Sequence, residues 1–158
     1  MDRVHATRDD GAPASARTIA EIERQLDVLV RSGRRAARQR AAMVDSHLQP
    51  LGFSVLVAIV RGPGRTHGDI AEAVGVDKSA LSKIVGELQR RGLVSQVASA
   101  QDRRMRLLEP TPAAVERVGA ALASRVAHLQ ARFAEWSEAD IRTLRDLLSR
   151  YNASEPGG

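Results

Sequence analysis

The segment GDIAEAVGVDKSALSKIVGELQRRG (68–92) groups four side chains that suit hydrogen bonding to another molecule: Lys78, Ser79, Ser82 and Lys83. Serine hydroxyls near the start of a helix can approach the edges of DNA bases. A lysine ammonium can donate to guanine O6 and N7 or to a phosphate. The sequence shows no paired nucleophile and base, no glycine-rich phosphate loop and no metal signature. These residue types therefore favour binding over catalysis, and we do not expect an enzyme.

The surrounding pattern predicts two short helices that hold these side chains outward. Thr66 is placed to cap the first, with Asp69 at the capping-box position, and Gly75 suits a turn with positive φ. Asp77 is placed to cap the second, whose predicted inward stripe is Leu81, Ile84, Val85 and Leu88. Gln89 then joins the outward set. Two helices joined by a short glycine turn form a helix-turn-helix, although an ordinary pair of surface helices is the alternative.

A predicted β-hairpin follows the second helix. Leu93-Val94 begins one strand, Arg106 to Leu108 forms its partner, and the tip carries Asp102, Arg103 and Arg104. This arrangement predicts a winged helix-turn-helix. An arginine on such a tip can enter a narrow minor groove, where negative potential is concentrated. Asp102 is expected to orient Arg104, although a solvated turn would contain the same residues.

Composition limits the function classes. The chain has 158 residues, no cysteine and a formal charge of +5, which excludes disulfides and thiolate metal sites. Its positive excess lies in the middle, where residues 31–60 hold five basic groups and one acidic group. That distribution suits a polyanion such as DNA, and a solvated basic surface equally well. No apolar run is long enough to span a membrane and no signal-peptide pattern is present, so we expect a cytoplasmic protein without a membrane partner.

The predicted organisation has five parts: a disordered leader (1–15), an N-terminal dimerisation helix (16–48), the winged helix-turn-helix (49–111), C-terminal dimerisation helices (112–151) and a flexible tail (152–158). The fold class is therefore mainly α with a small β-hairpin wing. The long flanking helices carry apolar stripes that so small a central unit cannot cover. The stripes could pack against each other or against a second copy of the chain, and we expect the second copy to cover them.

Other candidate residues lie beside these elements. Thr66 and His67, at a helix start, could contact a phosphate. His47 and Phe53 could line a pocket for a small molecule, although core packing is the more common role for such residues. The four histidines, His5, His47, His67 and His128, do not have metal-ligand spacing, so neither metal nor cofactor is expected.

The chain resembles the multiple antibiotic resistance regulator (MarR) family. The resemblance is carried by LQPLGFSVLVAI, by THGDIAEAVGVDKSALSKIVGELQRRGLV, and by DRR followed by a Thr-Pro helix start. It implies a homodimeric repressor on a pseudo-palindromic DNA operator, often released by a small aromatic or phenolic effector. It also implies base-reading positions at Ser79, Ser82 and Lys83, and a minor-groove arginine at Arg104. The sequence departs from the family at Gly86, where an acidic residue is common.

An alternative hypothesis is that the winged helix contacts another protein and does not bind DNA. Salt dependence separates the two, because a protein that neutralises several phosphates loses affinity steeply as salt rises.

Overall fold

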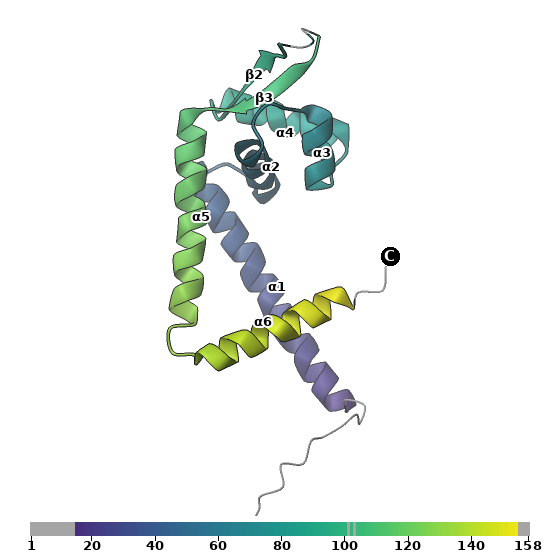
Figure 1. Ribbon diagram of the computed structural model, residues 1–158, viewed down its shortest axis with the longest axis vertical. Helices are drawn as coiled ribbons and strands as arrows, with labels where there is room; N and C mark the ends of the chain where they lie inside the picture. The colour runs from purple at the N-terminus through teal and green to yellow at the C-terminus, as the bar shows by residue number, and fades with distance from the viewer. Residues whose placement is uncertain (1–14, 101, 103, 155–158) are drawn as a thin grey trace, which may run out of the picture. The chain divides into compact units, whose positions relative to one another are not determined.

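The computed structural model describes residues 15–100, 102 and 104–154, and the expected leader and tail lie mainly outside these ranges (Figure 1). The chain divides into two compact units, Met1–Gln39 and Arg40–Gly158. The elements are α1 (Ala16–Val44), α2 (Pro50–Arg61), β1 (Arg65–Thr66), α3 (His67–Val74), α4 (Lys78–Arg90), β2 (Val94–Ala98), β3 (Arg106–Pro110), α5 (Pro112–Arg132) and α6 (Glu138–Ala153). Within the described residues, no helix combines the length and apolarity that crossing a membrane requires.

Helix α1 supplies all the described structure of the first unit. Ser15 caps it, because the Ser15 hydroxyl accepts the Thr18 backbone N–H at 3.2 Å. Ser15 therefore belongs to the helix start rather than to the expected leader. Large apolar side chains along α1, among them Ile19 and Ile22, are about half exposed.

The core of the second unit forms around α2, which is buried on most of its circumference. The sequence pattern predicted Phe53 and Leu56 as inward residues, and both are buried. It missed Val55 and Ile59, which are fully buried because neighbouring elements cover α2 on more than one side. Core residues from the rest of this unit include Ile70, Leu81, Val85, Leu88, Leu93, Leu108 and Val118.

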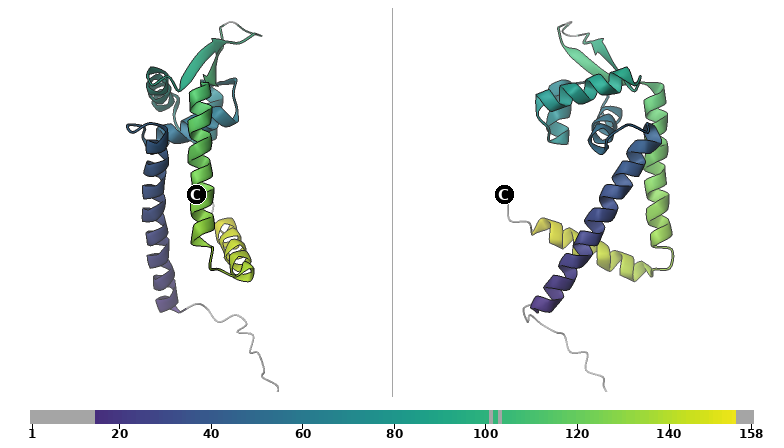
Figure 2. Two further views of the ribbon diagram at one scale, coloured as in Figure 1. Left: turned by 90° about the vertical axis from the view of Figure 1, so that its left-hand side faces the viewer. Right: turned by 180° about the vertical axis from the view of Figure 1, so that it is seen from behind.

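The predicted hairpin is present, and a third strand extends it. Strands β2 and β3 pair antiparallel from Val94 opposite Pro110 to Ala98 opposite Arg106. The two-residue strand β1 pairs with the other edge of β3, giving the order β1-β3-β2. Figures 1 and 2 show the hairpin projecting beyond α2, α3 and α4, while α5 leaves β3 in the opposite direction.

Helices α5 and α6 bury little of their apolar surface. Helix α5 buries Ala114, Val118 and Ala121 near its start, whereas Val126 and Leu129 are exposed. Helix α6 buries no residue and continues to Ala153, two residues into the segment expected to be a flexible tail. The structure thus leaves apolar faces open on the helices that the sequence assigns to dimerisation.

Candidate nucleic-acid interface

Local capping sets the direction of the two helices that form the helix-turn-helix. Thr66 and Asp69 form the predicted capping box, in which the Thr66 backbone N–H donates to Asp69 Oδ2 at 2.9 Å. Gly75 ends α3 in the left-handed region with φ of 73°, a conformation that a residue with a β-carbon adopts only under strain. Asp77 then accepts the Ala80 backbone N–H at 2.8 Å and starts α4. The predicted caps and the glycine turn are therefore confirmed.

Burial of one side of α4 determines what the other side presents. Leu81, Val85 and Leu88 are buried, with exposed fractions of 1% or less. The structure places all five predicted α4 residues on the exposed side: Lys78, Ser79, Ser82, Lys83 and Gln89. The predicted polar surface of α4 is therefore one continuous accessible face.

The two serine hydroxyls already donate within the helix. Ser79 Oγ donates to Asp77 Oδ1 at 2.7 Å, and Ser82 Oγ donates to the Lys78 carbonyl at 2.9 Å. Each oxygen keeps lone pairs that can accept. In these rotamers the serines offer acceptors, which suit the amino groups of adenine N6 or cytosine N4.

The caps also carry negative charge, and Asp77 lies against Ser79 of this face. The Ser79 hydroxyl and then the Ala80 amide donate to Asp77, and these hydrogen bonds lower the pKa of its carboxyl. The Thr66 backbone amide and then the Thr66 hydroxyl lower the pKa of Asp69 in the same way. Both carboxylates are therefore ionised at neutral pH and held against helix N-termini.

Both residues at the start of α3 that the sequence offers as phosphate contacts, Thr66 and His67, already contact other side chains of the protein. The Thr66 hydroxyl donates to Asp69 Oδ2 at 2.8 Å and accepts the Asp69 backbone N–H at 3.3 Å, so it acts as a cap. His67 Nε2 lies 3.5 Å from Gln96 Nε2 on β2. The side chain of His67 thus faces the wing strand, and its phosphate contact stays a prediction.

The wing tip is held by hydrogen bonds of its own. Asp102 Oδ1 accepts the Arg104 backbone N–H at 2.9 Å. Asp102 therefore contacts the expected partner at its main chain, and no guanidinium contact is recorded between these two described residues. Both side chains are exposed, whereas Arg103 lies outside the described residues.

The two candidates for a small-molecule pocket have different surroundings. Phe53 is part of the core, with 7% of its surface exposed. His47 is exposed in the turn between α1 and α2, where its backbone N–H donates to Asp45 Oδ1 at 2.9 Å. An effector site at these residues stays a prediction. Among the described residues, no group of three His, Cys, Asp or Glu side chains could hold a metal ion.

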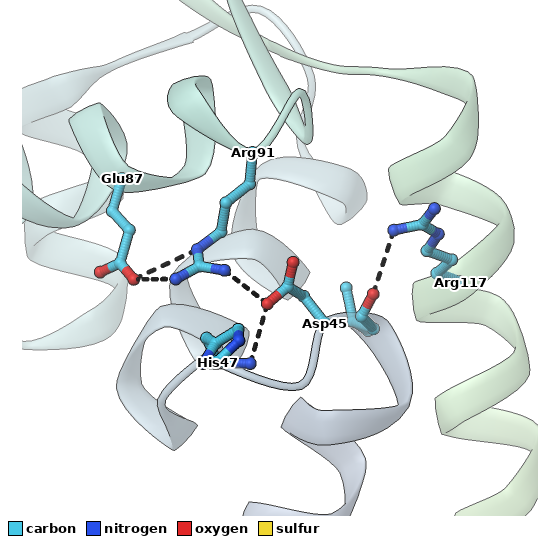
Figure 3. Close-up of polar contacts among 6 residues, drawn as sticks. Asp45, His47, Glu87, Arg91 and Arg117 are labelled. Atoms are coloured by element: carbon cyan, nitrogen blue, oxygen red, sulfur yellow. Dashed lines mark hydrogen bonds and ion pairs between the residues drawn. The ribbon is translucent and has the colours of Figure 1, made fainter.

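An ion-pair network that the sequence pattern did not predict lies at the end of α4 (Figure 3). Arg91 Nη1 lies 2.5 Å from Asp45 Oδ1, and Arg91 Nη2 lies 2.8 Å from Glu87 Oε1. Nearby, Arg117 Nη1 on α5 donates to the Val44 carbonyl at 3.2 Å. These contacts tie the α1–α2 turn to α4 and the end of α1 to α5. The spacing of Glu87 and Arg91 in the sequence indicates an i,i+4 ion pair. The Asp45 contact joins residues 46 positions apart and had no local signal.

Comparisons with known proteins agree with this geometry. Residues 48–105 match the model of the MarR family. A candidate transcriptional regulatory protein for the hcr operon of Thauera aromatica is 32% identical over 98 residues, which cover 62% of this chain and 59% of that protein.

Solved structures share the fold. RV1404 from Mycobacterium tuberculosis superposes with a TM-score of 0.76 at 18% identity, over 93% of this chain and 99% of that one. The multiple antibiotic-resistance repressor from Listeria monocytogenes gives 0.63 at 19% identity, over 90% and 97%. At these identities the likeness establishes a winged helix-turn-helix fold.

Proposed function

We propose, from the match of residues 48–105 to the MarR family model, that the chain is a sequence-specific DNA-binding transcriptional regulator. One observation carries the proposal: α4 is capped at its start, buried along one side, and polar and exposed along the other. A helix presented in this way can enter the major groove with its N-terminal residues facing the base edges.

The distribution of lysine supports the same reading. Lys78 and Lys83 are the only lysines of the chain, and both lie on the exposed face of α4. A mobile ammonium with three donors can contact either guanine or phosphate. We assign base reading to Ser79, Ser82 and Lys83, and a minor-groove contact to Arg104 on the wing tip.

The active form that we propose is a homodimer acting as a repressor. Exposed apolar side chains occur on the helices that flank the winged unit: Ile19 and Ile22 on α1, Val126 and Leu129 on α5, and Leu148 and Tyr151 on α6. A shallow groove beside α6 is lined by Trp136, Leu144 and Leu147 together with Glu135, Asp140 and Thr143. Exposed apolar side chains on each of these helices support an interface with a second copy. Two copies would present two α4 helices to half-sites about one helical turn apart.

The DNA-binding proposal is tested on DNA that flanks the protein's own gene, by footprinting and by fluorescence anisotropy at several salt concentrations. Ser82→Ala and Lys83→Ala should relax sequence preference, because each good base contact discriminates by about 1–3 kcal/mol. Arg104→Ala should weaken binding to all sequences and reduce the salt slope. Equal losses on every sequence for all three variants would contradict the division of roles. An absence of salt-dependent binding would favour the protein-contact alternative.

The dimer is tested by substituting an apolar residue of α6. Leu148→Glu should raise the dimer dissociation constant at least tenfold in sedimentation equilibrium, because it places a charge within an apolar interface. Ser149→Glu on the same helix is the matched control and should leave the dissociation constant nearly unchanged. A purified wild-type protein that is monomeric at micromolar concentration would contradict the proposal.

A small aromatic or phenolic effector is the remaining part of the proposal. It rests on the resemblance to the family, with His47 and Phe53 as the first residues to test. Addition of such compounds to the preformed DNA complex should release the DNA. His47→Ala should then reduce the release without changing affinity for the operator.

A further inference from the structure

Arg90 lies on the exposed side of α4, although the sequence analysis did not assign it a role. It comes eleven residues after Ser79, which is about three turns of helix, so the two residues share one line along the surface. Lys83 and Gly86 lie close to the same line, opposite the buried stripe of Leu81 and Leu88. Gln89, which the sequence analysis selected, lies to one side of it.

Gly86 leaves space in the middle of this line. Arg90 Nη1 lies 3.8 Å from the position that a β-carbon at Gly86 would occupy. The arginine side chain therefore extends back towards the N-terminus of the helix and lies above Gly86, the direction that helical side chains favour. A β-carbon at position 86 would be in ordinary contact with the guanidinium, so a small residue leaves Arg90 in place whereas a large one would displace it.

The neighbouring arginine has a different role. Arg91 is held by ion pairs to Asp45 and Glu87. The Arg90 guanidinium makes no ion pair or hydrogen bond with another described residue, and it is exposed. The pair Arg90-Arg91 thus contains one structural cation and one cation whose donors remain available.

We propose that Arg90 is a further DNA-contacting residue, which donates to a phosphate of the operator beside the major groove, and that the absence of a large side chain at position 86 keeps its path open. This inference rests on the proposed DNA-binding function. A phosphate is the favoured acceptor, because the first turns of a recognition helix face the bases and its last turn lies towards the backbone. A planar guanidinium suits a phosphate with two parallel hydrogen bonds.

The test measures operator binding by fluorescence anisotropy for the full-length wild type, Arg90→Ala and Arg90→Lys across a salt series. Arg90→Ala should weaken binding about tenfold or more, equally on the operator and on a scrambled duplex. The slope of log affinity against log salt should fall by about 0.9 for each copy that loses one contact. Arg90→Lys should retain most of the slope, since it keeps the charge.

A second pair of variants tests the role of Gly86. Gly86→Ala should leave affinity within about twofold, because a β-carbon at 3.8 Å is in ordinary contact. Gly86→Leu should weaken binding by displacing Arg90, and it should cause no further loss when combined with Arg90→Ala. Additive losses would mean that the leucine obstructs DNA directly, and would overturn the role of Gly86.

The outcomes separate this inference from the function on which it rests. Wild-type protein that binds with a steep salt slope, together with an unchanged Arg90→Ala variant, would refute the inference and leave the proposed function standing. Loss confined to the operator sequence would assign Arg90 to a base, and would refute the phosphate contact. A wild type without DNA binding would refute both.

Discussion

Replacing Arg91 by methionine tests whether the network in Figure 3 holds α4 in place. Methionine keeps most of the aliphatic stem but removes the guanidinium, which contacts Asp45 and Glu87. The side chains of Arg91 and Asp45 are 22% and 23% exposed, so their contact is partly shielded from water. Salt therefore screens it less than it screens an exposed pair.

The expected loss follows from these contacts. A hydrogen bond to a charged group contributes about 1.5–3 kcal/mol, whereas an exposed ion pair contributes about 0.2–1 kcal/mol. The Asp45 contact lies between these cases, and the more exposed Glu87 contact belongs with the second. We therefore expect Arg91→Met to lower the free energy of unfolding by about 2 kcal/mol, equivalent to about 4–8 °C in melting temperature.

The assay is urea unfolding followed by circular dichroism, at one fixed protein concentration because the proposed dimer would contribute to stability. Asp45→Asn completes a double-mutant cycle and keeps an oxygen that can accept the His47 backbone N–H. The coupling energy between Asp45 and Arg91 should be about 1–2 kcal/mol. Arg90→Met is the matched control and should change stability by less than about 0.5 kcal/mol. A coupling energy below about 0.5 kcal/mol, or an equal loss of stability in Arg90→Met, would refute a stabilising role for the Asp45–Arg91 contact.

Two further predictions concern the caps of the helix-turn-helix. Gly75→Ala should lower the free energy of unfolding by about 1–2 kcal/mol in urea titrations, because the added β-carbon meets no atom but is strained at φ of 73°. The same substitution at Gly86, inside α4, should instead raise stability, so a loss at both sites would argue against the left-handed turn. Asp77→Ala should lower the melting temperature at neutral pH, since it removes the cap of α4. Because hydrogen bonds lower the folded pKa of Asp77, its ionic contribution is complete above the unfolded pKa and is lost as pH falls through the folded pKa. The difference in melting temperature between Asp77→Ala and wild type should therefore become smaller below about pH 4. A difference that becomes larger there would contradict the predicted direction of the pKa shift.

Periodicity predicted most elements correctly, yet it was less informative about α2 and β1. An amphipathic stripe describes a helix that packs on one side, whereas α2 also buries Val55 and Ile59. Strand β1 has two residues, Arg65 and Thr66, which is too short to show alternation. It exists because the free edge of β3 is available to pair with it.

The sequence by itself determined the features that depend on neighbours three or four residues apart: the caps at Thr66 and Asp77, the glycine turn and the exposed polar face of α4. These features are local, so residue type and spacing suffice to specify them. Only the tertiary structure decided which of the two adjacent arginines forms ion pairs with other described residues and which does not. Asp45, which is 46 residues away in the sequence, forms an ion pair with Arg91, and a contact over that separation arises only when the chain is folded. The same holds for Asp102, which accepts a hydrogen bond from the Arg104 backbone N–H. Whether the backbone N–H or the guanidinium donates depends on the backbone conformation at the tip of the wing.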